Sequence, residues 1–72
     1  MRVLSNSQAE VLGSYILDRI VRLSFTCLEL EGKAMRYEEA GRIEEAALFY
    51  AARNRASDRM MDLHALLREM AP

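Results

Sequence analysis

The sequence has few of the residues that usually hold a small protein together. It contains one cysteine, Cys27, and one histidine, His64, and its one proline is the last residue. An internal disulfide is therefore excluded, and a zinc site of thiolates and imidazoles would lack ligands. A single domain of this size obtains only about 3–5 kcal/mol from its own core. We expect the missing stabilisation to come from self-association or from a partner chain.

Charge of one sign and long apolar runs are also lacking. The formal net charge is −1, and neither half of the chain has the basic excess typical of nucleic-acid binders. No run approaches the ~20 apolar residues that span a bilayer, and Ser5–Ser7 interrupts any secretory signal after a short lead-in at residues 1–4. One free cysteine is typical of a reducing compartment. We expect a cytoplasmic protein that needs no metal or cofactor.

What the chain does have is helix-forming sequence with apolar residues at steps of three and four. In the first part these are Leu12, Ile16, Ile20, Leu23, Cys27, Leu30, Ala34 and Tyr37, and we expect five more to widen the stripe: Val11, Tyr15, Val21, Phe25 and Leu28. Ser7 and Glu10 match a capping box, and Ser5 with Gln8 offers the same chemistry two residues earlier. The first helix is predicted over about residues 7–40.

A second helix is predicted over about residues 43–70. Two neighbouring stripes form its apolar face: Phe49, Ala56, Leu63 and Met70, then Ile43, Ala46, Tyr50, Ser57, Met60, His64 and Leu67. Gly41 is predicted to end the first helix in the left-handed conformation. The fold class is therefore all-α, an antiparallel helical hairpin that completes a bundle by self-association or by binding a partner.

Two alternatives stay open at this point. Residues 21–27 alternate strictly between apolar and polar, which is a strand pattern. We favour helix, because no second strand is available and a lone strand is not stable. A break near residues 24–26 would divide the first helix and give three. Gly13 and Gly32 mark either bends or close approaches between helices.

Folding the chain at Gly41 brings opposite charges together. The expected neighbours are Glu29 and Glu31 with Arg53 and Arg55, Arg22 with Asp58 and Asp62, and Asp18 with His64 and Arg68. Exposed pairs contribute only ~0–1 kcal/mol each, so they favour this register but do not hold the fold together.

The stretch from Ala34 to Arg53 resembles a single tetratricopeptide repeat. The small, aromatic, glycine, alanine and aromatic positions of that repeat are occupied by Ala34, Tyr37, Gly41, Ala46 and Tyr50. Arg53 stands where the repeat usually has alanine, and Asp58 where it often has proline. The same residues are similar to the hairpin of microtubule-interacting and trafficking domains, and in size and helical character the chain is similar to small hairpin chaperones of type III secretion. All three resemblances imply a helical surface that binds another protein.

The side chains that could act in catalysis or bind a metal are better explained by structural roles. Cys27 lies on an apolar stripe with no base nearby in sequence, and the lone His64 has a poor set of companion ligands. Four carboxylates flank the turn as a solvated acidic group: Glu38, Glu39, Glu44 and Glu45. Met35, Met60, Met61 and Met70 suit either core filling or an adaptable partner surface. We expect no enzyme.

The function predicted from the sequence is a small helical protein-interaction module that acts as an adaptor, a chaperone or an inhibitor. The residues expected to bind the partner, or a second copy, are Leu23, Leu30, Tyr37, Phe49, Tyr50, Met60, Leu63 and Leu67. The alternative is a small dimeric DNA-binding regulator of transcription that uses Arg53, Arg55 and Arg59 to contact phosphates.

Overall fold

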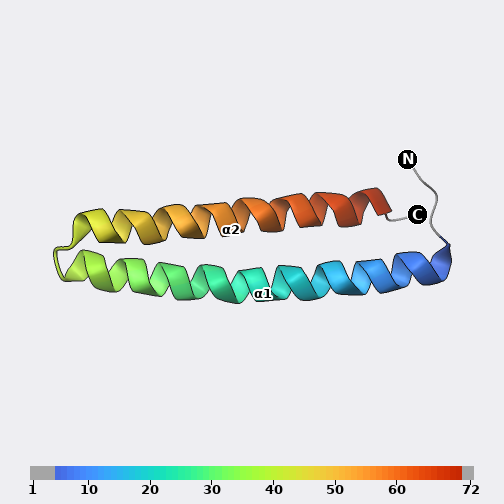
Figure 1. The fold of residues 1–72 in the computed structure, drawn as a ribbon, viewed down its shortest axis with the longest axis horizontal. Coiled ribbons are helices and arrows are strands. Elements are labelled where there is room, and N and C mark those ends of the chain that lie inside the picture. The colour runs from blue at the N-terminus through green and yellow to red at the C-terminus, as the bar shows by residue number, and fades with distance from the viewer. Residues whose placement is uncertain (1–4, 71–72) are drawn as a thin grey trace.

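The computed structural model describes residues 5–70 and shows two antiparallel α-helices joined by a tight turn (Figure 1). Helix α1 spans Asn6–Glu39 and helix α2 spans Ile43–Met70. The molecule is a rod that measures 53 × 18 × 12 Å. The predicted all-α hairpin is confirmed, with helix bounds within one residue of those expected. The predicted lead-in at residues 1–4 lies outside the described residues.

Helix α1 begins at a capping box, but not at the one we favoured. The Ser5 hydroxyl accepts a hydrogen bond from the Gln8 N–H at 3.2 Å, and the Gln8 side-chain oxygen accepts one from the Ser5 N–H at 3.1 Å. The prediction of a box at Ser7 and Glu10 was wrong, and the earlier start is confirmed. A neutral glutamine amide oxygen completes the reciprocal pair as well as a carboxylate does.

Residues 21–27 are helical and continuous with the rest of α1, so neither a strand nor a third helix occurs in this stretch. Their alternation has another cause. Side chains two residues apart lie on nearly opposite sides of a helix. Leu23 is buried against α2 and Cys27 is partly buried there, whereas Val21 and Phe25 are 52% and 62% exposed. The alternation therefore indicates a helix that has apolar side chains on two sides.

The turn is a Schellman motif, as the glycine at its centre predicts. Gly41 has a φ of +80°, and its N–H donates to the Glu38 carbonyl at 3.0 Å. The Arg42 N–H donates to the Tyr37 carbonyl at 2.8 Å, so two carbonyls at the end of α1 are satisfied. Arg42 then bonds Glu45 in the first turn of α2, with Nε 2.8 Å from Oε1.

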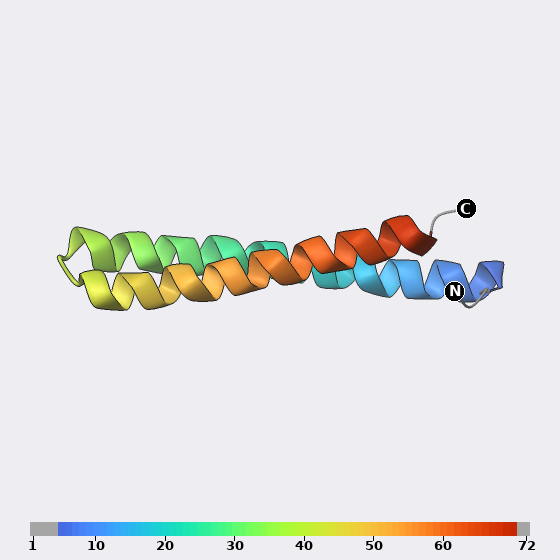
Figure 2. The same ribbon diagram turned by 90° about the horizontal axis from the view of Figure 1, so that it is seen from above.

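The two helices meet along a heptad-spaced seam, defined by the residues of each helix that face the other. On α1 the seam residues are Gly13, Ile16, Ile20, Leu23, Cys27, Leu30, Ala34 and Tyr37; on α2 they are Ala46, Phe49, Arg53, Ala56, Met60, Leu63, Leu67 and Met70. All sixteen are buried or partly buried, and the steps of three and four never break. Such spacing keeps two helices in contact over a long distance with a small crossing angle, which Figure 2 shows.

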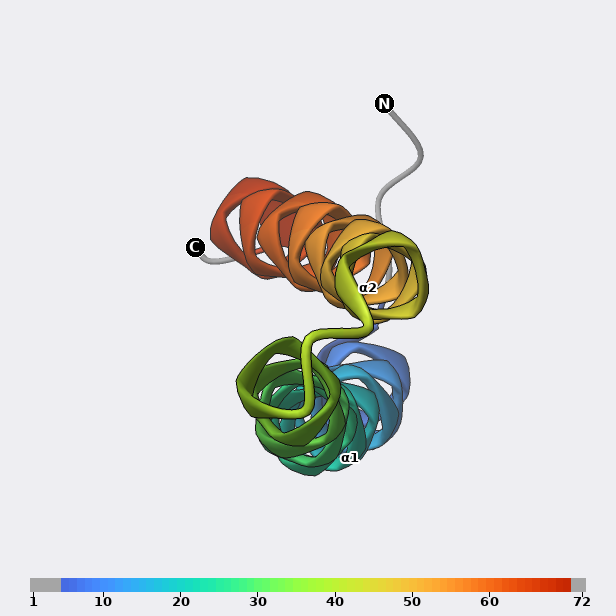
Figure 3. The same ribbon diagram turned by 90° about the vertical axis from the view of Figure 1, so that its left-hand side faces the viewer.

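Several residues that we expected to line this seam lie outside it. Leu12 was expected on the stripe, but it is 39% exposed and Gly13 takes the seam position. Val11, Tyr15, Val21, Phe25 and Leu28 are 52–71% exposed and do not widen the seam. Ile43 and His64 on α2 are exposed as well. The reason is geometric, because a single neighbouring helix covers only one narrow stripe of each partner. The end view in Figure 3 shows two helices side by side, with the rest of each helix surface uncovered in this single chain.

The charge pairs across the hairpin are fewer than expected. Glu31 does reach Arg53, with 3.8 Å between Oε1 and Nη1. Arg22 instead pairs with Asp18 on its own helix, at 2.9 Å, so the expected pairing of these two residues with α2 was wrong. Residues four apart on a helix are close neighbours whatever the tertiary structure, and both side chains are more than half exposed.

Candidate interaction surface

The residues predicted to bind a partner lie between the two helices. Leu23 is buried in the seam and six others line it partly buried: Leu30, Tyr37, Phe49, Met60, Leu63 and Leu67. Tyr50 lies beside the seam and is also partly buried. The rings of Tyr37 and Phe49 stack with centroids 5.1 Å apart, close to the turn. These side chains hold the hairpin together, and their contact with a partner stays a prediction.

Arg53 shows which residues share one side of the hairpin. Its guanidinium lies 5.2 Å from the centre of the Tyr50 ring and donates to the Asn54 side-chain oxygen at 2.9 Å. The same guanidinium is the group that approaches Glu31 on α1. Tyr50, Asn54 and Glu31 each come one residue after a seam position. In two antiparallel helices, residues that follow seam positions therefore project to the same side, and residues that precede them project to the other.

The side formed by the residues that come one position after seam residues is called the apolar face. Its large side chains are Leu17, Val21, Leu28 and Met35 on α1 and Tyr50 and Met61 on α2. Small residues fill positions between them: Ser14, Ser24, Ala47 and Ser57. Phe25 borders this face on the outer side of α1. Between Ser14 and Arg68 the face carries three charged residues, Glu31, Glu38 and Arg68, and Glu31 already approaches Arg53.

The side formed by the residues that come one position before seam residues is called the charged face. It carries ten charged residues: Arg19, Arg22, Glu29, Lys33, Arg36, Glu45, Arg55, Arg59, Asp62 and Glu69. Lys33 lies over the Phe49 ring, with Nζ 6.0 Å from its centre, which agrees with this assignment. Six of the ten are basic and four are acidic. The same side also exposes four large apolar side chains, Leu12, Tyr15, Leu48 and Leu66, so the two faces differ in charge more than in apolar content.

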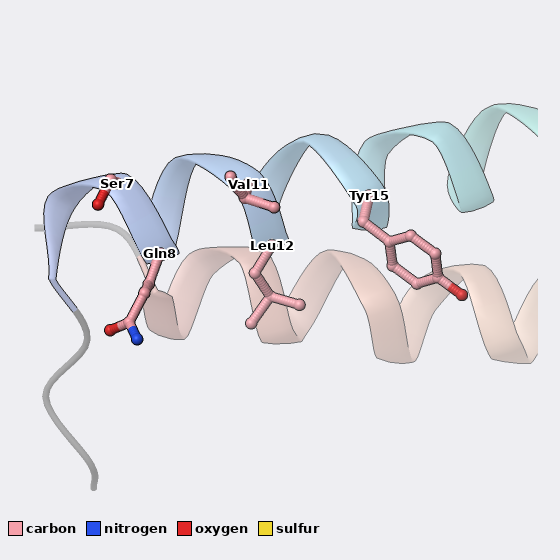
Figure 4. Close-up of a pocket in the computed structure, with 5 residues that line it drawn as sticks. All are labelled: Ser7, Gln8, Val11, Leu12 and Tyr15. Atoms are coloured by element: carbon pink, nitrogen blue, oxygen red, sulfur yellow. The ribbon is translucent and has the colours of Figure 1, made fainter.

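An apolar hollow of about 570 Å³ lies near the N-terminal end of α1. Ser7, Gln8, Val11, Leu12 and Tyr15 line it, and Figure 4 shows Leu12 and Tyr15 extending from α1 over the path of α2. The hollow is open to solvent. It has one amide and two hydroxyl groups among its lining residues, so it lacks a charged group that would orient a small ligand.

Cys27 and His64 have different surroundings in the described part of the chain. The Cys27 thiol donates to the Arg53 carbonyl at 3.8 Å and is partly buried, while His64 is exposed on α2. Among residues 5–70, no three or more histidine, cysteine, aspartate or glutamate side chains gather where they could hold a metal ion. Arg55 and Arg59 lie on the charged face, whereas the Arg53 guanidinium extends from the seam toward Tyr50 and Asn54.

The sequence patterns could have revealed the apolar face. Leu17, Val21, Ser24 and Leu28 repeat the seam spacing one residue later, so α1 carries two heptad stripes about a quarter-turn apart. Val21 and Leu28 were assigned to the first stripe, so the second stripe was not recognised.

No family model, curated protein or solved structure matches the chain. Neither helix of the described chain combines the length and apolar character needed to cross a membrane.

Proposed function

We propose that this protein is a non-enzymatic helical interaction module that binds another protein chain through its apolar face, as an adaptor, a chaperone or an inhibitor. The observation that carries the proposal is the stripe of large apolar side chains on the uncovered side of α1. Leu17, Val21, Phe25 and Leu28 are each 52–63% exposed, although only five hydrophobic residues are buried within residues 5–70. Exposed apolar patches of several hundred Å² often mark a site where another protein binds.

The total exposed surface supports the same proposal. A compact monomer of this mass exposes about 4,600 Å², whereas this chain exposes 5746 Å². With roughly 150–250 Å² for a whole large side chain, the five α1 side chains from Leu17 to Met35 present about 500 Å². Covering that area contributes on the order of 12 kcal/mol. Association itself costs about 4–15 kcal/mol, so the partner must bring apolar surface of its own.

The spacing of the exposed residues indicates the kind of partner. Leu17, Val21 and Leu28 lie four and seven residues apart on one helix face, as anchors do when an amphipathic helix packs into an apolar groove or along other helices. The partner is therefore expected to be helical, with an apolar groove at least as long as this stripe.

The alternative, a DNA-binding regulator, receives less support. Arg53 is a poorer candidate for phosphate contact than Arg55 and Arg59, because its guanidinium lies near Tyr50, Asn54 and Glu31. Acidic residues interleave with the basic ones on the charged face. If the alternative held, the affinity for duplex DNA would fall steeply with added salt and would depend on Arg55 and Arg59.

The test is affinity capture from the native host with two matched variants as bait. Leu28→Glu places a charge on the apolar face, and Leu48→Glu places the same charge at a similarly exposed position on the charged face (63% and 70% exposed). We expect Leu28→Glu to lose the specific partner and Leu48→Glu to retain it. Equal capture by both variants would refute a role for the apolar face.

A further inference from the structure

We infer that a second copy of this chain covers the apolar face, so that two hairpins form a four-helix bundle with α1 packed antiparallel against α1 of the other copy. This inference rests on the proposed function, because it names one occupant for the same face. It adds a stoichiometry, an orientation and a pair of helices in contact.

The area of the face suits an isologous dimer. Phe25 only borders the face, so each copy contributes about 400 Å² from Leu17, Val21, Leu28 and Met35, and two copies bury roughly 800 Å² from these residues alone. Specific interfaces bury about 1,200–2,000 Å² in total. Tyr50 and Met61 lie on the same face, and Met61 is 65% exposed, so α2 supplies the remainder. Two copies can therefore reach the size of a specific interface without another partner.

The sparse charge on this face also favours self-association. When a surface packs against its own copy, every charge on it meets a symmetry-related environment, and charges near the axis meet their own kind. Over its central part, from Ser14 to Met35 on α1, the face has Glu31 as its one charged side chain, and Glu31 is turned toward Arg53. The charged face has ten charges of both signs, and desolvating them would be costly.

The two helices differ in a way that sets the orientation. On the apolar face α1 presents Leu17, Val21, Leu28 and Met35, whereas α2 presents Asn54, Ser57 and His64 besides Tyr50 and Met61. Packing α1 on α2 of the second copy would bury these polar groups against leucine and valine. Packing α1 on α1 and α2 on α2 places apolar against apolar and polar against polar. A two-fold axis perpendicular to the helices produces this arrangement, with every neighbouring pair antiparallel.

The second stripe is also placed correctly for a bundle. The seam and the stripe from Leu17 to Met35 lie about a quarter-turn apart around α1, which is the angle between the two neighbours of a helix in a four-helix bundle. One stripe then contacts α2 of the same chain and the other contacts α1 of the second copy.

The first measurement is the mass of the full chain by light scattering and sedimentation over a range of concentrations. We expect a dimer, and we expect Leu28→Glu to raise the dissociation constant by about 100-fold or more, because both copies lose a buried leucine. Leu48→Glu, on the charged face, should leave the dimer unchanged. Circular dichroism checks that both variants remain helical. A monomeric wild-type chain, or equal effects of the two variants, would overturn the inference.

The second measurement tests the orientation by cross-linking in a Cys27→Ala background. Ser24 lies near the middle of the α1 stripe, close to the proposed two-fold axis, and Thr26 lies on the charged face. With a short bis-maleimide, Ser24→Cys should give a covalent dimer in high yield and Thr26→Cys should not. If α1 packed on α2 of the second copy, the two Ser24 positions would lie diagonally across the bundle and would not cross-link, which would overturn the proposed orientation.

The outcomes separate this inference from the proposed function. A monomer that still loses a captured protein on Leu28→Glu would refute the second copy and retain the apolar face as a binding surface. A dimer that Leu28→Glu leaves intact would refute the assigned interface, whatever the capture experiment shows.

Discussion

Arg53 reaches across the hairpin to Glu31, with its Nη1 3.8 Å from the Glu31 Oε1, from a seam position whose α2 neighbours are all apolar. The guanidinium lies at the edge of the seam, where it packs over the Tyr50 ring and donates a hydrogen bond to Asn54. A charged residue is thus accommodated between the helices because its head group remains partly in water. Its side chain is 32% exposed, so the pair with Glu31 is screened and weak.

Replacing Arg53 with leucine should therefore stabilise the hairpin. Leucine continues the heptad of apolar seam residues, and its burial outweighs the loss of a partly exposed ion pair and a cation–π contact. We expect a gain of about 0.5–1 kcal/mol, which raises the thermal midpoint by roughly 2–8 °C in a domain of this size. The matched control is Arg55→Leu on the charged face, which should give no gain. A lower midpoint for Arg53→Leu would show that the polar contacts dominate.

Leucines in the seam and on the charged face should respond differently to truncation. Leu23 is 8% exposed and Leu48 is 70% exposed. We expect Leu23→Ala to cost about 2–4 kcal/mol, a large share of what so small a core supplies, and Leu48→Ala to cost less than about 0.5 kcal/mol. Urea titrations followed by circular dichroism measure both values. Similar losses at the two positions would contradict the seam as described.

The start of α1 offers a prediction that separates two serines. Ser5 forms the capping box with Gln8, and the Ser7 hydroxyl makes one long contact of 3.4 Å with Ser5. We expect Ser5→Ala to lower the free energy of unfolding by about 1 kcal/mol and Ser7→Ala to change it little. Chemical denaturation of the two variants measures both changes. A larger loss of unfolding free energy for Ser7→Ala would show that Ser7, and not Ser5, caps α1.

Local patterns made much of the fold predictable. The two helices follow from periodicity and propensity, and Gly41 follows from the backbone conformation that ends a helix, so neither depends on distant contacts. The seam on α1 was predictable for the same reason, since the steps from Ile16 to Tyr37 are unbroken. The serine that caps α1 was ambiguous, because two overlapping boxes have equivalent chemistry.

The candidate surface was harder to predict, because α1 carries two apolar stripes. Sequence spacing alone does not say which stripe faces α2 and which remains uncovered; that depends on how much of α1 one neighbouring helix can reach. The interruption of the second stripe by Ser24 and Glu31 is the signal that distinguishes it from the seam. The pairing of Asp18 with Arg22 was missed because the hairpin register was considered alone, although residues four apart on one helix are already neighbours.

The glycines should give stability changes of opposite sign. A β-carbon at Gly13 would lie 3.9 Å from Leu67 Cδ2, an ordinary van der Waals contact in the seam, and one at Gly32 would meet the distal end of Arg36 at 3.9 Å. Alanine therefore fits at both positions and removes the entropic cost of glycine inside a helix, so each substitution should stabilise by about 0.5–1 kcal/mol.

Gly41 is the opposite case, because its φ of +80° disfavours any residue with a β-carbon, although the space around it is open. We expect Gly41→Ala to destabilise by roughly 1 kcal/mol or more, since the Schellman turn would be strained or lost. Thermal melts of the three alanine variants compare helix propensity with turn geometry in one experiment. Stabilisation by Gly41→Ala would mean that the connection between the helices can form without the left-handed residue.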